Sequence, residues 1–289
     1  MTSTDQQQTQ RDDEIKQTVN ERYGAIADRV LAADQPSDAL KIEFLESPAA
    51  NCCGADSADE ACCGPAAVEL TGAEGAADEG IEYGSKLYSE GETSTLPASA
   101  VNASLGCGNP VAIAELNAGE RVLDLGSGGG IDCFLSAQQV GAEGEVWGLD
   151  MTPSMVRLAR RNADKVEASN VHFRLGEIED MPFETDHFDA IISNCVINLS
   201  TDKAQVFREA FRVLKPGGRL RVSDMVWTKD VPLEERGDSE AWAGCVAGAL
   251  PLAEYLGAIE AAGFVEAGAD YEDSDRGIAS AYVSAVKPA

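Results

Sequence analysis

Residues 122–130 read VLDLGSGGG, a short apolar run that leads through an acid into a chain of glycines. A strand, a glycine-rich loop and a helix in this order form the ligand-binding corner of an open α/β sheet. The dinucleotide fingerprint requires a small residue at the position of Ile131, so this loop departs from it. Asp124 before the loop disfavours a pyrophosphate and suits a cationic group. We therefore expect a nucleotide-like ligand that carries a positive charge.

The alternation of strands and helices continues after the loop. Short apolar runs predict strands at 121–125, 144–150, 171–175, 188–194 and 219–224. Helices are predicted at 131–140, from Thr152-Pro153 onward, and between Asp202 and Leu214. Strands joined through helices need crossover connections, which place the strands parallel in one sheet. The chain is therefore predicted to be an α/β protein with a doubly wound, mostly parallel sheet, to which residues 282–286 add an edge strand.

The sequence on either side of this core differs in character. Apolar residues at helical spacing predict an N-terminal helix over 12–34. Residues 50–80 are rich in alanine, glycine and acids, and they predict a loop that contains two Cys-Cys pairs. Helical stretches are expected at 239–249 and 251–262. The predicted domains are an N-terminal helix and cysteine-containing region (1–95), the core (96–228) and a small C-terminal domain (229–289).

Charge and hydrophobicity exclude several classes of partner. The 289 residues carry 50 acidic and 22 basic side chains, a formal net charge of −28 that is spread along the chain. Nucleic acids and anionic membrane surfaces both require clustered lysine and arginine, so neither is an expected partner. No apolar run reaches the roughly 18–20 residues that span a bilayer, and the first residues lack a secretory signal. We expect a soluble cytoplasmic protein, with a monomer as the working expectation, whose acidic shell suits a salt-loving source.

Cysteine chemistry is the main indication of the substrate. The chain has eight cysteines, and reduced thiols indicate soft-ligand binding or redox chemistry, although each one alone also fits core packing. Cys195 follows the predicted strand 188–194 at the ligand-binding edge. His172 and His187 are the only histidines, and neither forms an evident His–carboxylate pair to activate an oxygen or carbon acceptor. A trivalent arsenic centre has its own lone pair, needs no such base and prefers soft thiolates.

These residues carry two levels of resemblance. The order acid-x-Gly-x-Gly-x-Gly at 124–130 resembles the first motif of the class I S-adenosylmethionine methyltransferases, whose Rossmann-like core has seven strands. The chain as a whole resembles the arsenite methyltransferases. The most specific segments are LGCGNP at 105–110 and SNCVINL at 193–199. Further matching segments are YGAIA at 23–27, VLDLGSGGGIDC at 122–133, DMT at 150–152 and WAGC at 242–245.

The resemblance implies S-adenosylmethionine as the methyl donor. Asp150 ends the second strand, 20 residues after Gly130, where an acid accepts hydrogen bonds from ribose hydroxyls. Capping of the next helix is the structural alternative for this aspartate. The residues implied to bind the cofactor are Asp124, Gly126, Ser127, Gly128, Asp150, Met151, Glu177, Ile178 and Asn194, with Glu177 and Ile178 beside the adenine.

In the arsenite methyltransferases, three converging cysteines hold As(III), and the resemblance assigns this role to Cys107, Cys195 and Cys245. It implies that arsenite arrives as a thiol complex and exchanges onto these sulfurs. The arsenic lone pair then attacks the methyl carbon in line, and the protein contributes mainly alignment. The oxidised product is reduced with transient disulfide formation among the same cysteines, and a thiol reductant such as thioredoxin or a glutathione-like thiol resets them.

Two other functions stay open from the sequence. A methyltransferase of a quinone or sterol-like carbon acceptor shares the core but has no need of the three cysteines. A non-catalytic metalloid-binding protein would bind arsenite without the cofactor. Cys133 is expected to pack in the core or to serve at most as an auxiliary disulfide partner. Cys52-Cys53 and Cys62-Cys63 lack the spacing of a zinc site, so arsenic capture is the hypothesis for them, beside a merely tolerated loop.

Overall fold

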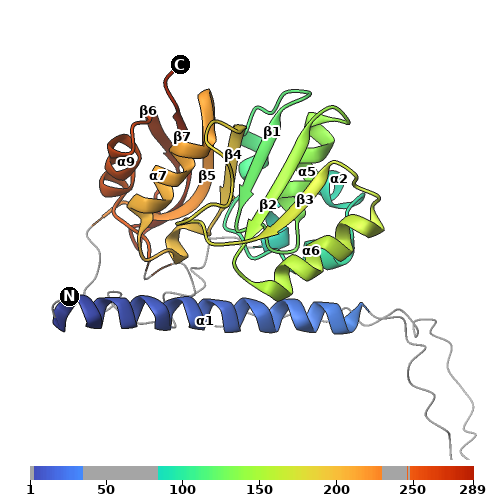
Figure 1. Cartoon of the computed structure of the whole chain (residues 1–289), viewed down its shortest axis with the longest axis horizontal. Helices are drawn as coiled ribbons and strands as arrows, with labels where there is room; N and C mark the ends of the chain where they lie inside the picture. The colour runs from blue at the N-terminus through green and yellow to red at the C-terminus, as the bar shows by residue number, and fades with distance from the viewer. Residues whose placement is uncertain (1–2, 35–83, 230–245, 247) are drawn as a thin grey trace, which may run out of the picture.

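Seven strands form one mixed, mostly parallel sheet in the computed structural model, which describes residues 3–34, 84–229, 246 and 248–289 (Figure 1). The strand order is β3-β2-β1-β4-β5-β7-β6. The strands are β1 (Arg121–Leu125), β2 (Glu145–Asp150), β3 (Val171–Leu175), β4 (Phe188–Asn194), β5 (Leu214–Trp227), β6 (Val265–Tyr271) and β7 (Ile278–Val286). β1 to β5 are mutually parallel, as predicted, and β7 runs antiparallel to both β5 and β6.

The sheet order corrects one expectation about the C-terminal strand. Residues 282–286 were expected at the edge of the sheet, but they belong to β7, which lies between β5 and β6. β6 is the edge strand, and its mostly exposed or half-exposed residues lack the alternation that marks a strand in a sequence. The boundary between a core and a C-terminal domain at 228/229 stays a prediction, although both C-terminal strands hydrogen-bond within the same sheet.

Alternating side chains of the strands build a core on each face of the sheet. In β1, Val122 packs on one face, and Leu123 and Leu125 pack on the other. The first face is covered by α4 (Pro110–Ile113), α5 (Ile131–Val140) and α6 (Pro153–Lys165). The second is covered by α7 (Lys203–Val213) and α9 (Leu252–Ala261). This arrangement is the predicted doubly wound fold, with α9 matching the helix expected at 251–262.

Capping residues set the starts of several helices. The Asp202 side chain accepts a hydrogen bond from the backbone N–H of Gln205 at 2.9 Å and begins α7. Asn109 caps α4 in the same way, through the N–H of Ala112 at 3.1 Å. Pro153 occupies the first turn of α6. Short helical segments also lie at η2 (Gly84–Leu87), α2 (Glu90–Thr93), α3 (Ala98–Asn102) and η3 (Ile197–Leu199).

The N-terminal helix α1 (Ser3–Ala33) lies along the side of the sheet domain where the glycine loop is found (Figure 1). It is longer than the predicted 12–34 because a polar stretch precedes its apolar residues. Ala27 and Val30 of α1 pack against Met155 and Leu158 of α6. Ion pairs flank this contact, joining Arg157 to Asp28, and Arg161 and Lys165 to Asp34. Further along α1, Lys16 pairs with Glu177. Helix α1 is therefore held by both an apolar contact and ion pairs.

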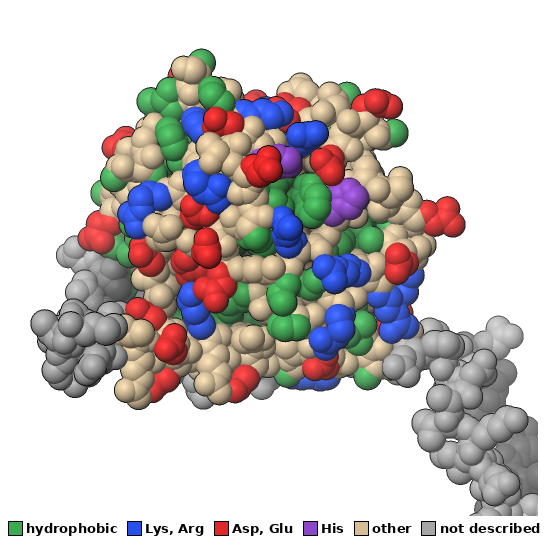
Figure 2. Space-filling model, in the orientation of Figure 1, with side chains coloured by type: hydrophobic (Ala, Val, Ile, Leu, Met, Phe, Trp, Pro, Cys, Tyr) green, Lys and Arg blue, Asp and Glu red, His purple; other side chains and the backbone are tan. Residues whose placement is uncertain are grey.

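Several predicted segments fall outside the described residues: the loop at 50–80 with its cysteine pairs, the helix at 239–249, and Cys245. Within the described part of the chain, no helix combines the length and the hydrophobicity that a membrane crossing requires. On the face shown in Figure 2, acidic and basic side chains are interspersed rather than gathered by sign. Many basic residues pair with acids, as Arg219 does with Glu120 and Lys215 with Asp189.

Phe188 should contribute strongly to the stability of the core between the sheet and the helices α7 and α9. Its side chain is fully buried, and its ring lies edge-on to Phe183 with centroids 5.0 Å apart. We expect Phe188→Ala to lower the free energy of unfolding by about 3–5 kcal/mol, measured by urea denaturation. Leu175→Ala is the control, because this leucine is 50% exposed and its truncation should cost less than about 0.5 kcal/mol. Equal losses in the two variants would contradict the assignment of this core.

Candidate active site

A cleft lies at the carboxyl ends of the parallel strands, bounded by the glycine loop, the ends of β2 and β4, and α1. Its empty volume is about 960 Å³ including the open mouth, within the usual range for small-molecule sites. α1 contributes Lys16, Val19 and Tyr23 to the walls. Seven of the predicted cofactor-binding residues line the cleft: Gly126, Ser127, Gly128, Asp150, Met151, Ile178 and Asn194.

The glycine loop closes tightly over the end of β1. Gly126 has a φ of 67°, in the left-handed region, and a Cβ built on it would lie 2.3 Å from a methyl group of Val196. Only glycine fits both the conformation and the space at this position. The backbone of the loop therefore forms the floor of the cleft itself, where a ligand approaches the main chain directly.

Asp150 is the last residue of β2 and faces the cleft. Its carboxylate accepts hydrogen bonds from the backbone N–H groups of Gly128 and Thr152, at 2.9 and 2.8 Å. Burial raises the pKa of Asp150, and these two hydrogen bonds partly oppose the shift. Thr152 is the residue just before α6, and no side-chain hydrogen bond caps the start of that helix. The hydrogen bond from Thr152 to Asp150 therefore orders the turn that leads into α6.

Two predicted residues, Asp124 and Glu177, are not among those that line the cleft. Asp124 lies beneath the glycine loop, 2% exposed, and accepts a hydrogen bond from the Cys133 thiol at 3.2 Å. Burial, followed by the charge of Asp132, raises the pKa of Asp124 well above its usual range. Glu177 is exposed and forms an ion pair with Lys16. Cys133 belongs to α5, is buried, and packs in the core on the first face of the sheet.

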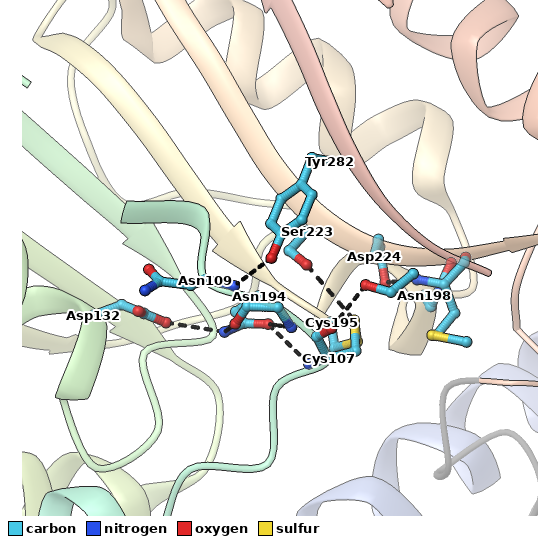
Figure 3. Close-up of a disulfide and its surroundings, with 12 residues drawn as sticks. Cys107, Asn109, Asp132, Asn194, Cys195, Asn198, Ser223, Asp224 and Tyr282 are labelled. Carbon is cyan, nitrogen blue, oxygen red and sulfur yellow. Dashed lines mark hydrogen bonds between the residues drawn. A yellow bond between two sulfur atoms is a disulfide. The ribbon is translucent and has the colours of Figure 1, made fainter. Parts of the chain in front are cut away.

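Cys107 and Cys195 meet at the side of the cleft and form a disulfide, although 88 residues separate them in sequence (Figure 3). Cys195 follows β4 directly, and its φ of 60° places a non-glycine residue in the left-handed region. Cys107 comes from the segment that precedes α4. The structure thus brings together two of the three predicted arsenic-binding cysteines, and Cys245 lies outside the described residues.

The side chain of Asn194 holds the backbone around Cys107 in place. Its Oδ1 accepts hydrogen bonds from the N–H groups of Cys107 and Gly108, at 3.0 and 3.3 Å. Its Nδ2 donates to the carbonyl of Gly108 at 2.7 Å. From the other side, the hydroxyl of Ser280 in β7 donates to the carbonyl of Cys107 at 2.7 Å. The position of the Cys107 sulfur is therefore fixed by β4 and β7 together.

Asp224 is a buried carboxylate beside the two sulfurs, and the sequence analysis did not predict it as a site residue. One of its oxygens and the sulfurs of Cys107 and Cys195 all lie within 4.8 Å of one another. Tyr255 donates a hydrogen bond to it at 3.0 Å. Burial raises the pKa of Asp224 to about 7. A signal existed in the sequence, because Asp224 ends the predicted strand 219–224, next to the strand that ends at Asn194.

Four more polar residues near the cleft were also missed: Tyr88, Asn109, Asp132 and Tyr282. Tyr88 donates a hydrogen bond to Asp132 at 2.8 Å, and Asn109 approaches the hydroxyl of Tyr282 with its backbone N–H at 3.3 Å (Figure 3). Asp132 stands two residues after the glycine loop, so its sequence position was a usable signal. No local pattern marks Tyr88 or Tyr282, because their partners are far away in the sequence.

Asp224 should make stability depend on pH. Its pKa of about 7 in the folded protein exceeds the ordinary value of 3.8, so folded molecules keep a proton that unfolded molecules lose. The contribution of Asp224 to the free energy of unfolding therefore falls as pH rises from about 4 to about 7, by at most about 1.4 kcal/mol per pH unit. We expect the difference in unfolding free energy between the oxidised wild-type protein and Asp224→Asn to fall between pH 5 and pH 8. A constant difference across this range would contradict the buried, protonated carboxyl.

The chain is similar to known methyltransferases. Residues 116–273 match a protein family described as "Methyltransferase domain". An arsenite methyltransferase of Halobacterium salinarum is 44% identical over 205 residues, which cover 70% of this chain and 52% of that relative. A ubiquinone/menaquinone biosynthesis C-methyltransferase of Vibrio campbellii is 44% identical over 106 residues, which cover 36% of this chain and 40% of that relative. The chain therefore spans about half the length, or less, of these curated relatives.

Among solved structures, the crystal structure of an arsenic(III) S-adenosylmethionine methyltransferase from Chlamydomonas reinhardtii superposes with a TM-score of 0.58. The two chains are 33% identical, and the match covers 69% of this chain and 73% of that one. The similarity thus extends over most of the algal protein in that crystal structure.

Proposed function

This chain belongs to the methyltransferase-domain family, in the group of the arsenite methyltransferases, and we propose that it moves methyl groups from S-adenosylmethionine to trivalent arsenic held by cysteine sulfurs. S-adenosylmethionine supplies an electrophilic methyl group on a cationic sulfur. The observation that carries the arsenic assignment is the meeting of Cys107 and Cys195 at the side of the cleft.

The residues of the cleft fit this cofactor. A polar nucleoside with a cationic end needs a close backbone approach, an acid for the ribose and negative charge near the sulfonium. Gly126 and Gly128 line the cleft with main chain alone, and Asp150 is the acid at the end of β2. Met151 and Ile178 supply apolar walls. We assign Asp150 to the ribose hydroxyls and Ile178 to the adenine, with Glu177 at the outer rim.

The sulfur pair suits a soft metalloid. Cys107 and Cys195 lie in an apolar cluster with Met225 and Trp227, where water competes poorly for the substrate. We assign the third arsenic ligand to Cys245. Cys107 and Cys195 place the arsenic at the side of the cleft, so its lone pair faces the methyl carbon. Because the lone pair is already available, no general base is required. The protein contributes alignment and a dry pocket, and Asn194 keeps Cys107 in position.

A reduction step completes the reaction. Methyl transfer forms an arsenic–carbon bond, breaks the sulfur–methyl bond and oxidises arsenic from the trivalent to the pentavalent state. Two electrons from a pair of thiols return the arsenic to the trivalent state, and the thiols become a disulfide. The Cys107–Cys195 disulfide is the state that such a step leaves behind. A dithiol such as thioredoxin, or a glutathione-like thiol of the cytoplasm, then reduces the pair for the next arsenite.

An activity assay tests this function. Purified protein is incubated with arsenite, S-adenosylmethionine and a dithiol, in low and in high salt, because the net charge of −28 predicts a requirement for salt. We expect mono- and dimethylated arsenic, separated by chromatography and detected by mass spectrometry. The absence of methylated arsenic in protein that binds the cofactor would overturn the proposal.

Methylation of a carbon acceptor is the second candidate, favoured by the similarity to the quinone C-methyltransferase. That reaction has no use for the sulfur pair, and the match to that relative covers 36% of this chain. A non-catalytic arsenic-binding protein is the third. Such a protein would bind arsenite but not S-adenosylhomocysteine, the product left by the methyl donor. Calorimetric titration with S-adenosylhomocysteine therefore distinguishes it from the arsenic methyltransferase and from the carbon methyltransferase.

A further inference from the structure

The carboxylates around the glycine loop have no cationic partner in the described part of the chain. Asp124, Asp132 and Asp150 are each at least nine-tenths buried, and their hydrogen bonds come from a thiol, a phenol, an amide side chain, the Thr152 hydroxyl and backbone N–H groups. Lys16 reaches the cleft but pairs with Glu177 and lies near Glu179. Buried carboxylates without cations favour a positively charged ligand.

Asp132 differs from the other two in its position. Asp124 lies below the loop outside the cleft, and both oxygens of Asp150 accept backbone hydrogen bonds. Asp132 lines the cleft from the first turn of α5, close to Asn194 and to the end of β4. Figure 3 shows its carboxylate directed toward the Asn194 amide. Burial raises the pKa of Asp132 to about 6, so the group is mostly ionised at neutral pH.

Among the residues that the structure describes, one oxygen of Asp132 has no hydrogen-bond donor of its own. Oδ1 accepts the Tyr88 hydroxyl at 2.8 Å. The one described donor to Oδ2 is the Asn194 Nδ2 at 3.3 Å, and that nitrogen is closer to the Gly108 carbonyl (2.7 Å) and to the Tyr88 hydroxyl (3.0 Å). An amide nitrogen carries two protons, and these two nearer acceptors use both. Oδ2 is therefore a buried charged acceptor that is left almost unsatisfied, which is costly unless a ligand supplies the hydrogen bond.

We propose that Asp132 binds the α-ammonium group at the methionine end of the cofactor, through Oδ2. The proposal rests on the proposed function for the identity of the cofactor. An ammonium group offers three donors and a positive charge, which is what this oxygen lacks. Asp150, at the far side of the loop, binds the ribose, so the two aspartates bind different ends of the same cofactor molecule. The Tyr88 hydroxyl keeps the Asp132 carboxylate oriented through its hydrogen bond to Oδ1.

Two ligands that differ at the ammonium test this assignment by isothermal titration calorimetry. S-adenosylhomocysteine carries the amino-acid end, whereas 5′-methylthioadenosine lacks it and keeps the nucleoside. We expect Asp132→Asn to raise the Kd of S-adenosylhomocysteine by about 10- to 100-fold. The Kd of methylthioadenosine should change less than about threefold, because that ligand has no ammonium. Asp150→Asn is the matched control and should weaken both ligands by similar factors, since both carry the ribose.

A second measurement needs no variant and so does not depend on the folding of Asp132→Asn. The wild-type protein is titrated with the analogue of S-adenosylhomocysteine that lacks only the α-amino group. We expect a loss of about 10- to 100-fold relative to S-adenosylhomocysteine. Equal binding of the two, or equal weakening of both ligands by Asp132→Asn, would overturn the assignment and leave the proposed function standing. Failure of wild-type protein to bind either nucleoside would instead contradict the proposed function.

Discussion

Replacing Cys195 with serine is expected to abolish arsenic methylation and to leave cofactor binding unchanged. Serine keeps the size and the backbone conformation, but its hydroxyl is a hard ligand that does not hold trivalent arsenic. Without this sulfur the arsenic is no longer aligned with the methyl group, and a misplacement of about 1 Å already costs about 100-fold in rate. We therefore expect a loss of about 100-fold or more. Cys107→Ser should behave alike, since both sulfurs occupy the same place at the cleft.

Methylated arsenic and the Kd of S-adenosylhomocysteine are measured on the same preparations. Cys133→Ser is the matched control, because that thiol is buried on α5 in a different apolar cluster from the pair, and a hydroxyl still donates to Asp124. It should retain most of the activity. If Cys195→Ser methylates arsenite at more than a tenth of the wild-type rate, the sulfur pair does not hold the substrate. Retained methylation of a quinone-like carbon acceptor in the same variant would favour the second candidate function.

Gly108→Ala is expected to destabilise the protein and to move Cys107 away from Cys195. A Cβ at this position would lie 1.8 Å from Oγ and 2.7 Å from Cβ of Ser223, which is itself fully buried in β5. No rotation of the serine removes the second contact, so the backbone must shift. Overpacking of this kind costs about 1–3 kcal/mol or more. Gly108 is the neighbour of Cys107, so its shift also displaces Cys107. The Asn194 side chain holds both residues in position by accepting hydrogen bonds from their N–H groups.

Urea denaturation gives the stability loss, and thiol titration after mild oxidation reports whether the disulfide still forms. Gly268→Ala is the control, because a Cβ on this residue of β6 meets nothing within 4 Å. Its effect should stay below about 0.5 kcal/mol. A Gly108→Ala protein that is as stable as the control and still forms the disulfide would show that the contact with Ser223 does not constrain the Cys107 segment.

The part of the fold with regular local signals was predictable. Strands from Arg121 to Asn194 are short apolar runs bounded by glycine, proline or polar residues, and their helices are marked by caps such as Asp202. β6 was not predicted, because an edge strand with half-exposed residues has no alternation to detect. Position within the sheet is equally invisible locally, and so β7 was expected at the edge that β6 occupies.

The candidate site was predictable where it follows directly from strand ends. Asp150 and Asn194 each end a predicted strand, and parallel strands bring such ends to one side of the sheet. The proximity of Cys107 and Cys195 came from resemblance, since 88 residues separate them. Contacts such as Tyr255 with Asp224, or Tyr88 with Asp132, depend on tertiary packing between distant segments. Sequence spacing carries no information about such pairs.

The left-handed backbone at Cys195 sets the stability of the fold against the presence of a thiol at this position. A left-handed conformation costs an ordinary L-residue about 1–2 kcal/mol, and glycine would avoid that cost at this corner. A glycine there would have no sulfur to offer. The chain thus tolerates local strain at the one corner where a thiol must reach over the end of β4. Stabilising substitutions chosen for this position on folding criteria alone would remove one of the two sulfurs to which we assign the arsenic.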